Sequence, residues 1–228
     1  MSDELILVVE DEEDIQELLE YTLLNAGYRV DVTDRGEEAL ELVREHSPAL
    51  MVLDLMLPGL DGLEVCRRLK SSEDVNSLPV IILTAKGEEE DVIAGFDAGA
   101  DDYITKPFSP KVLTARVQAV LRRSAESRPD AEGAITFGEI HIHPGRFEVH
   151  VDGEPVSLTH TEFRILHFLA SRPGWVFSRT QIVRAVHGED YPVTGRSVDV
   201  QVASLRKKLG AASRHITTVR GVGYKLGE

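Results

Sequence analysis

The sequence of 228 residues contains a single cysteine, Cys66, and aromatic residues make up only 6% of it. One cysteine excludes a disulfide within the chain and fits a reducing compartment such as the cytoplasm. No apolar run reaches the ~18 residues that a membrane-spanning helix needs, so we expect no membrane association. The first residues, MSDELILVVE, are acidic where a secretory signal peptide would be basic. These absences predict a cytoplasmic protein.

Basic residues are too few to balance the acidic ones, and the formal net charge is -14. The excess is confined to residues 1–123, which carry a net charge of -15, whereas residues 124–228 carry +1. Within the second part, residues 172–225 have a balance of +7. This asymmetry indicates two modules with different partners. We predict domains at 1–123 and 134–228, joined by a linker over 124–133 that lacks apolar periodicity.

Short apolar runs alternate with amphipathic stretches in the first module. Several runs are apolar throughout, which is typical of strands covered on both faces. The stretches between them repeat apolar residues at the spacing of a helix. Five strands alternating with five helices predict an α/β fold with a doubly wound, five-stranded parallel sheet. The expected strands are Leu5–Val9, Tyr28–Val32, Leu50–Leu53, Val80–Leu83 and Tyr103–Thr105.

Polar residues stand at the carboxyl ends of these strands, where ligands of such sheets bind. Carboxylates gathered there would repel one another unless a cation shares the site. Oxygen ligands favour a hard divalent ion, so we predict Mg²⁺. A lysine beside it would counter added negative charge, such as a phosphoryl group. The residues concerned are Glu10, Asp11, Asp54, Thr84 and Lys106.

Related chemistries lack their motifs in this sequence. The P-loop pattern G-x-x-x-x-G-K-[ST] is absent. Acidic residues 10–13 stand where a dinucleotide-binding fold would place G-x-G-x-x-G. A phosphohydrolase of the haloacid dehalogenase type would have a second aspartate two residues after Asp54, where this chain has Met56. A lone aspartate at a strand end is often a helix cap, but the whole set is hard to explain by capping.

Four segments resemble the receiver domain of two-component response regulators over about residues 4–123: VVEDEED, LMVLDLMLPGLDGLEVCRRLK, ILTAKGEEED and GADDYITKPFSP. The resemblance implies a flavodoxin-like fold in which Asp54 accepts a phosphoryl group from a sensor histidine kinase. It assigns Thr84 and Lys106 to the phosphoryl oxygens and implies a cis peptide after Lys106. Tyr103 would be a switch residue, although an ordinary core aromatic is the alternative. The implied Mg²⁺ site consists of Asp11, Asp54 and the Met56 main-chain carbonyl, with Glu10 supporting them through water.

The second module shows short strands, three helical stretches and a terminal hairpin. Asp152-Gly153 is a strong signal for a type I′ turn. Thr159 and Glu162 match a capping box at the start of the first helix. The third helix, over residues 195–209, has one apolar and one basic face. This order predicts a second, α+β domain, a winged helix-turn-helix whose third helix enters the major groove of DNA. A protein-binding domain with a solvated basic helix is the alternative.

Residues 134–228 resemble the winged-helix effector domain of the OmpR/PhoB class, through LTHTEFRILHFLASRPGWVFSRTQIV, GRSVDVQVASLRKKL and TTVRGVGYKL. The resemblance implies binding to direct-repeat half-sites in double-stranded DNA, and contact of the loop 187–194 with RNA polymerase. Ala203 and Ser204 stand where some members have arginines, so no particular operator is implied. The implied DNA contacts are Arg196, Ser197, Gln201, Ser204, Arg206, Lys207 and, on the wing, Arg220.

The same class forms a homodimer through its receiver domains when phosphorylated. One Arg–Glu pair between its subunits corresponds here to Val92 and Val112, so an ion pair is replaced by an apolar pair. We hypothesise that the dimer persists with a contact less sensitive to salt. The other residues at matching places are Asp97, Asp101, Asp102, Arg116 and Arg123.

The combined interpretation is a transcription factor that phosphorylation of Asp54 activates for dimerisation and DNA binding. It would catalyse only its own phosphoryl transfer and slow dephosphorylation, so it is not expected to be an enzyme in the usual sense. Two alternatives remain: a DNA-binding protein with a vestigial receiver, and a phosphatase-like enzyme acting on small phosphoryl compounds.

Overall fold

The computed structural model describes residues 4–72, 74–85, 94–96, 98–126, 133–188 and 196–227. The chain divides into two compact units, residues 1–122 and 123–228, and each is considered by itself. The final helix of the first unit, α5 (Pro110–Glu126), continues for three residues into the segment predicted as a linker. None of the helices in the described part of the chain is long and apolar enough to cross a membrane.

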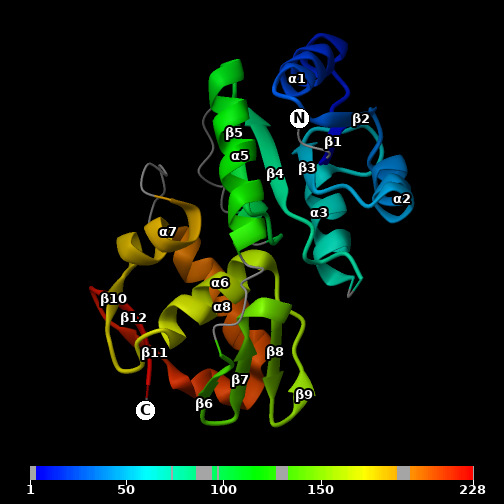
Figure 1. Ribbon diagram of the computed structural model, residues 1–228. Helices are drawn as coiled ribbons and strands as arrows, with labels where there is room; N and C mark the ends of the chain where they lie inside the picture. Colours follow the sequence, from blue (N-terminus) through cyan, green and yellow to red (C-terminus); the bar gives the residue numbers. More distant parts are fainter. Residues whose placement is uncertain are drawn as a thin grey trace. The chain divides into compact units, whose positions relative to one another are not determined.

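The first unit is built on a parallel sheet of five strands in the order β2-β1-β3-β4-β5 (Figure 1). This confirms the predicted doubly wound fold, and each strand lies within one or two residues of its predicted bounds. The strands are β1 (Leu5–Val9), β2 (Arg29–Thr33), β3 (Leu50–Asp54), β4 (Val80–Ala85) and β5 (Asp102–Lys106).

Helices cover both faces of this sheet because alternate strand residues point to opposite sides. In β1, Leu7 and Val9 belong to a core that includes residues of α2 and α3, whereas Ile6 and Val8 belong to a core shared with α1 and α5. The helices not yet given are α1 (Glu13–Asn25), α2 (Gly36–His46) and α3 (Gly62–Ser71). The predicted fourth helix falls largely outside the described residues, of which 94–96 are helical.

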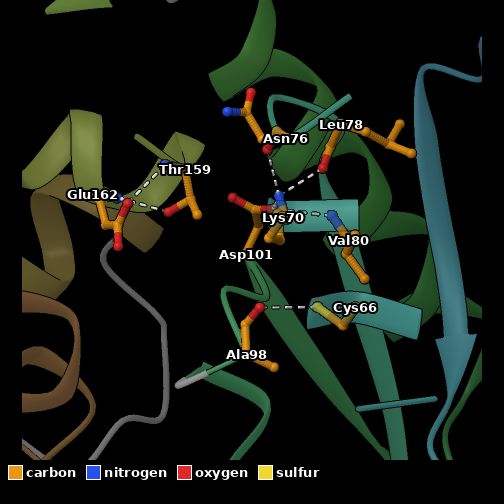
Figure 2. Close-up of polar contacts among 9 residues, drawn as sticks. All are labelled: Cys66, Lys70, Asn76, Leu78, Val80, Ala98, Asp101, Thr159 and Glu162. Carbon is orange, nitrogen blue, oxygen red and sulfur yellow. Dashed lines mark hydrogen bonds and ion pairs between the residues drawn. The ribbon is translucent and has the colours of Figure 1, made fainter. Parts of the chain in front are cut away.

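A buried ion pair ties the end of α3 to β4 and β5. Lys70 Nζ lies 2.8 Å from Asp101 Oδ2, and their side chains are 4% and 3% exposed. The ammonium also donates to the carbonyls of Leu78 at 2.7 Å and Asn76 at 3.3 Å, while Asp101 Oδ2 accepts from Val80 N at 3.0 Å. Figure 2 shows these groups converging on Lys70. A buried charge is tolerated only when it is paired and hydrogen-bonded in this way.

The second unit has the predicted winged-helix organisation. Its helices are α6 (His160–Ala170), α7 (Arg179–His187) and α8 (Arg196–Leu209), with 3-10 turns η1 (Pro144–Arg146) and η2 (Gly210–His215). A four-stranded antiparallel sheet precedes them: β6 (Ile135–Phe137), β7 (Ile140–His143), β8 (Glu148–Val151) and β9 (Glu154–Pro155). The terminal hairpin of β11 (Ile216–Val219) and β12 (Gly223–Leu226) pairs with β10 (Phe177–Ser178).

Two local predictions in this unit are confirmed. Asp152 and Gly153 both have positive φ, 54° and 86°, as a type I′ turn requires between β8 and β9. Thr159 and Glu162 form the predicted capping box, in which each side chain accepts from the other's backbone N–H. Both features are local, so the sequence alone carries enough information to predict them.

Candidate phosphoacceptor and metal site

The carboxyl ends of β1, β3 and β5 bring an ammonium group against three carboxylates. Asp54 is the last residue of β3, Lys106 the last of β5, and Glu10 follows β1 directly. Lys106 Nζ lies 2.9 Å from Asp54 Oδ2, 2.8 Å from Glu10 and 3.4 Å from Glu12 Oε1. The peptide between Lys106 and Pro107 is cis, as predicted. The parallel sheet therefore brings Glu10, Asp54 and Lys106 together from distant parts of the sequence.

The acidic cluster differs in one member from the predicted set. Oxygens of Glu10, Glu12 and Asp54 lie within 4.8 Å of one another, whereas Asp11 is exposed and is not part of this group. The chain bends at Asp11 after β1 ends at Val9, and Asp11 stays a predicted ligand. Met56 has a side chain that is 74% exposed, and its carbonyl remains a predicted ligand. The acidic run over residues 10–13 is the sequence feature from which the participation of Glu12 could have been predicted.

Glu10 is the most deeply buried carboxylate of the cluster. Burial, together with the nearby charge of Asp54, raises its pKa to about 7, although hydrogen bonding to Lys106 opposes this. Its Oε2 is buried and lies 2.8 Å from Lys106 Nζ in an ion pair. Three carboxylates whose oxygens lie within 4.8 Å of one another are a suitable donor set for a hard divalent cation, so these residues fit the predicted Mg²⁺. Such an ion would supply positive charge to a phosphoryl group.

The raised pKa of Glu10 predicts that Mg²⁺ binding depends on pH. Below pH 7 the carboxyl is protonated, and binding must displace that proton, so we expect affinity to rise about tenfold from pH 6 to pH 8. Calorimetric titration with Mg²⁺ in buffers of different ionisation enthalpy would measure the released proton. Glu10→Gln should bind more weakly and without this pH dependence. An unchanged pH profile in that variant would contradict the assignment.

Lys106 is held as a cation by its neighbours. Burial lowers the pKa of its ammonium, but the hydrogen bonds to Glu10 and Asp54 outweigh this and leave the pKa raised. The group therefore stays charged at neutral pH and can neutralise charge added to Asp54. This arrangement fits the role that the sequence predicted for it.

Thr84 and Tyr103 lie on the neighbouring strands β4 and β5. Thr84 is buried at 2% exposure, and its neighbour across the ladder is Thr105. Tyr103 is half-buried, and its ring packs edge-on against Phe96 at 5.9 Å. The ring is thus neither fully exposed nor in the main core, and its role as a switch remains a prediction.

The predicted DNA contacts on α8 fall into different environments. Ser197 and Gln201 are buried in this structure. Ser204 Oγ donates to Glu162, and Arg206 Nη2 donates to Ile216 O and Thr218 Oγ1. These two side chains are therefore engaged within the domain. Two predicted contacts are exposed, Lys207 and Arg220, and the side chain of Arg196 lies outside the described residues.

The predicted dimer face is likewise only partly exposed. Asp102 pairs with Arg116 at 3.0 Å within the chain. Asp101 differs from the prediction: it lies buried against Lys70 instead of on an outer face, because the loop before β5 turns its carboxylate toward the Val80 amide. Val112 is 45% exposed. The predictions for Val92, Asp97 and the Arg123 side chain lie outside the described residues.

Comparison with protein families gives a match for each unit. Residues 6–118 match the response regulator receiver domain. Residues 153–226 match the family described as transcriptional regulatory protein, C terminal. The first match contains the whole acidic site, and the second contains α6, α7, α8 and the terminal hairpin.

Curated relatives align along nearly the whole chain. The phosphate regulon transcriptional regulatory protein PhoB of Rhizobium meliloti is 46% identical over 224 residues, 97% of each chain. The alkaline phosphatase synthesis transcriptional regulatory protein PhoP of Bacillus subtilis is 42% identical over 98% of this chain and 96% of that protein. These relatives therefore share both units in the same order.

Solved structures agree with this organisation. The response regulator DrrB, a Thermotoga maritima OmpR/PhoB homologue, is 35% identical over the full length of both chains with a TM-score of 0.51. A mutant of RitR has a TM-score of 0.80 at 26% identity, and the match covers 99% of each chain.

Proposed function

Because the chain belongs to the OmpR/PhoB-type response regulators, which join a receiver domain to a winged-helix DNA-binding domain, we propose that a phosphoryl group on Asp54 controls its binding to DNA. As a two-component response regulator it is a transcription regulator and not a conventional enzyme. The observation that carries the proposal is the contact of Lys106 with both Asp54 and Glu10.

The proposed phosphoryl transfer follows from these contacts. The Asp54 carboxylate attacks the phosphorus of a phosphohistidine on a sensor kinase, the P–N bond breaks, and an acyl phosphate forms. Lys106, already 2.9 Å from Asp54 Oδ2, neutralises charge on the transferred group. Glu10, Glu12 and Asp54 would hold Mg²⁺, which supplies further positive charge when bound. The phosphoryl group adds about 1.5 to 2 negative charges, which would draw Thr84 and Lys106 inward.

The proposed output is dimerisation and DNA binding. Movement of Thr84 would free space for the Tyr103 ring, which already borders Phe96, and would reshape the surface around β5 and α5. The resulting homodimer would place two α8 helices on direct-repeat half-sites, with Lys207 and Arg220 exposed to phosphates. The loop 187–194 is the proposed contact with RNA polymerase, and the cytoplasm, where the DNA of a bacterium lies, is the proposed site of action.

The exposed Val112 predicts a dimer whose affinity changes little with salt. An apolar contact is screened far less than an ion pair, so raising salt from about 0.1 to about 0.5 M should change the dimer dissociation constant less than about twofold. Val112→Thr, which keeps the shape but adds a hydroxyl, should weaken the dimer. Sedimentation of the beryllofluoride-treated protein would measure both effects. A monomer under these activating conditions would refute the dimer itself.

The proposed function can be tested on the intact chain. Bound genomic fragments would be selected with and without beryllofluoride and Mg²⁺. Direct repeats should be enriched in the treated sample, and much less or not at all in the untreated one. Equal enrichment in both samples would indicate a vestigial receiver. Rapid turnover of acetyl phosphate without DNA binding would indicate a phosphatase-like enzyme instead.

A further inference from the structure

Glu162 has more partners than its role as a helix cap requires. It is the third residue of α6, is 1% exposed, and accepts from Thr159 N through Oε2 at 2.8 Å. Thr159 Oγ1 in turn accepts from Glu162 N at 3.3 Å, and Figure 2 shows both bonds. These two bonds complete a capping box and satisfy the start of α6. Any further contact of the carboxylate serves another purpose.

The same carboxylate binds α8 at two points. Ser204 Oγ donates to Glu162 Oε1 at 2.7 Å, and Lys208 Nζ donates to Oε2 at 2.7 Å. Ser204 and Lys208 are four residues apart, so both lie on one face of α8. Hydrogen bonds to a buried charge are shorter and stronger than neutral ones. Two such bonds one turn apart fix the rotation of α8 about its own axis.

Rotation of α8 decides which side chains it presents. Lys207 is exposed and lies about 100° around the helix from Lys208, which Glu162 holds. A rotation by one residue, about 100°, would replace it with another side chain. A side chain must reach the base edges within hydrogen-bond distance, so sequence discrimination is more sensitive to this angle than attraction to phosphates.

We propose that Glu162 is a positioning residue for DNA recognition, which sets the rotation of α8 through Ser204 and Lys208. Ser204 then links α8 to α6 by a hydrogen bond and does not contact DNA, in contrast to the expectation from the sequence. The inference rests on the proposed function only in that α8 is taken to meet DNA.

Three substitutions separate positioning from capping. Glu162→Gln keeps an oxygen for Thr159 N, because glutamine also completes a capping box, but it removes the charge that binds Lys208. Ser204→Ala removes one tie and leaves the cap untouched. Thr159→Ala is the matched control, since it removes half of the cap and leaves both ties to α8. Each variant is made in the full chain.

The readout is the ratio of affinities for a selected fragment and for an unrelated fragment of equal length. We expect Glu162→Gln and Ser204→Ala to lower this ratio about tenfold, the value of one charge-assisted hydrogen bond. Affinity for the unrelated fragment should be unchanged in Ser204→Ala, and equal or higher in Glu162→Gln, because only the latter loses an acidic group. Thr159→Ala should lower thermal stability but keep the ratio. The double variant Glu162→Gln, Ser204→Ala should lower this ratio no more than either substitution alone.

Several results would overturn the inference. One is an unchanged ratio in Glu162→Gln and Ser204→Ala, with stability lowered as in Thr159→Ala. Another is a double variant in which the two losses of the affinity ratio add up in full. Additive losses would mean that the two substitutions act on independent contacts. Absence of DNA binding by the unsubstituted protein would instead refute the proposed function, so the two failures are distinguishable. If Glu162→Gln does not fold, the smaller Ser204→Ala substitution still decides the question.

Discussion

Substitution of Asp54 by alanine is expected to abolish phosphorylation of the protein and, with it, all phosphorylation-dependent DNA binding. The carboxylate is the proposed nucleophile, and no acyl phosphate can form without it. Intact mass after incubation with acetyl phosphate and Mg²⁺ should rise by one phosphoryl group in the unsubstituted protein and not at all in Asp54→Ala. Binding to a selected fragment should respond to beryllofluoride only in the former. Lys106 loses a partner at 2.9 Å but retains Glu10, so the site should remain folded.

A neighbouring aspartate provides the control for this experiment. Asp61 caps α3 by accepting from Glu64 N at 2.8 Å, outside the acidic cluster. Asp61→Asn removes one negative charge but keeps a good capping residue, so phosphorylation and stability should hardly change. Phosphorylation of Asp54→Ala at an undiminished rate would show that another residue is the acceptor and would remove the basis of the proposal.

Replacement of Lys70 by methionine is expected to destabilise the receiver unit by about 3–5 kcal/mol, because it leaves the carboxylate of Asp101 buried without its cation. Asp101→Asn should also destabilise the unit, since Lys70 then loses its counter-ion, although an amide oxygen can still accept from Val80 N. The double variant should lose clearly less unfolding free energy than the two single variants lose when their losses are added together. The two groups are in contact, and such pairs are not additive.

The position of the only tryptophan makes this measurement specific. Trp175 belongs to the second unit, so its fluorescence follows unfolding of that unit, whereas circular dichroism follows both. In urea, Lys70→Met should shift the dichroism transition and leave the Trp175 transition in place. A loss of unfolding free energy below about 1 kcal/mol in both single variants would show that the ion pair contributes little to the stability of the fold.

The elements predictable from the sequence are those whose signals are local. Strand bounds, the capping box of Thr159 and the turn at Asp152-Gly153 depend on periodicity or on residues within four positions of each other. The contact between Asp54 and Lys106 was predictable because a parallel sheet must bring strand ends together, although the residues are 52 positions apart.

The features that escaped prediction depend on packing between distant side chains. Asp101 was assigned to an outer face because sequence does not reveal that Lys70, 31 positions earlier, draws it inward. The bond of Ser204 to Glu162 was not predicted, because the two residues are 42 positions apart in the sequence. That Glu12 joins the acidic cluster was not predicted, because it depends on how the chain leaves β1. In each case residue type limited the possible chemistry, while the backbone determined the partner.

Cys66 has a practical consequence for spectroscopy on this protein. It lies on α3, is fully buried, and its Sγ donates to Ala98 O at 3.5 Å, while burial raises its pKa to about 12. At neutral pH there is essentially no thiolate to react with maleimides or methanethiosulfonates. Cysteines engineered onto the surface would therefore be the only thiols to take up a spin label or fluorophore. With one in each unit, distances between the two units could be recorded on the full chain without first removing the native cysteine.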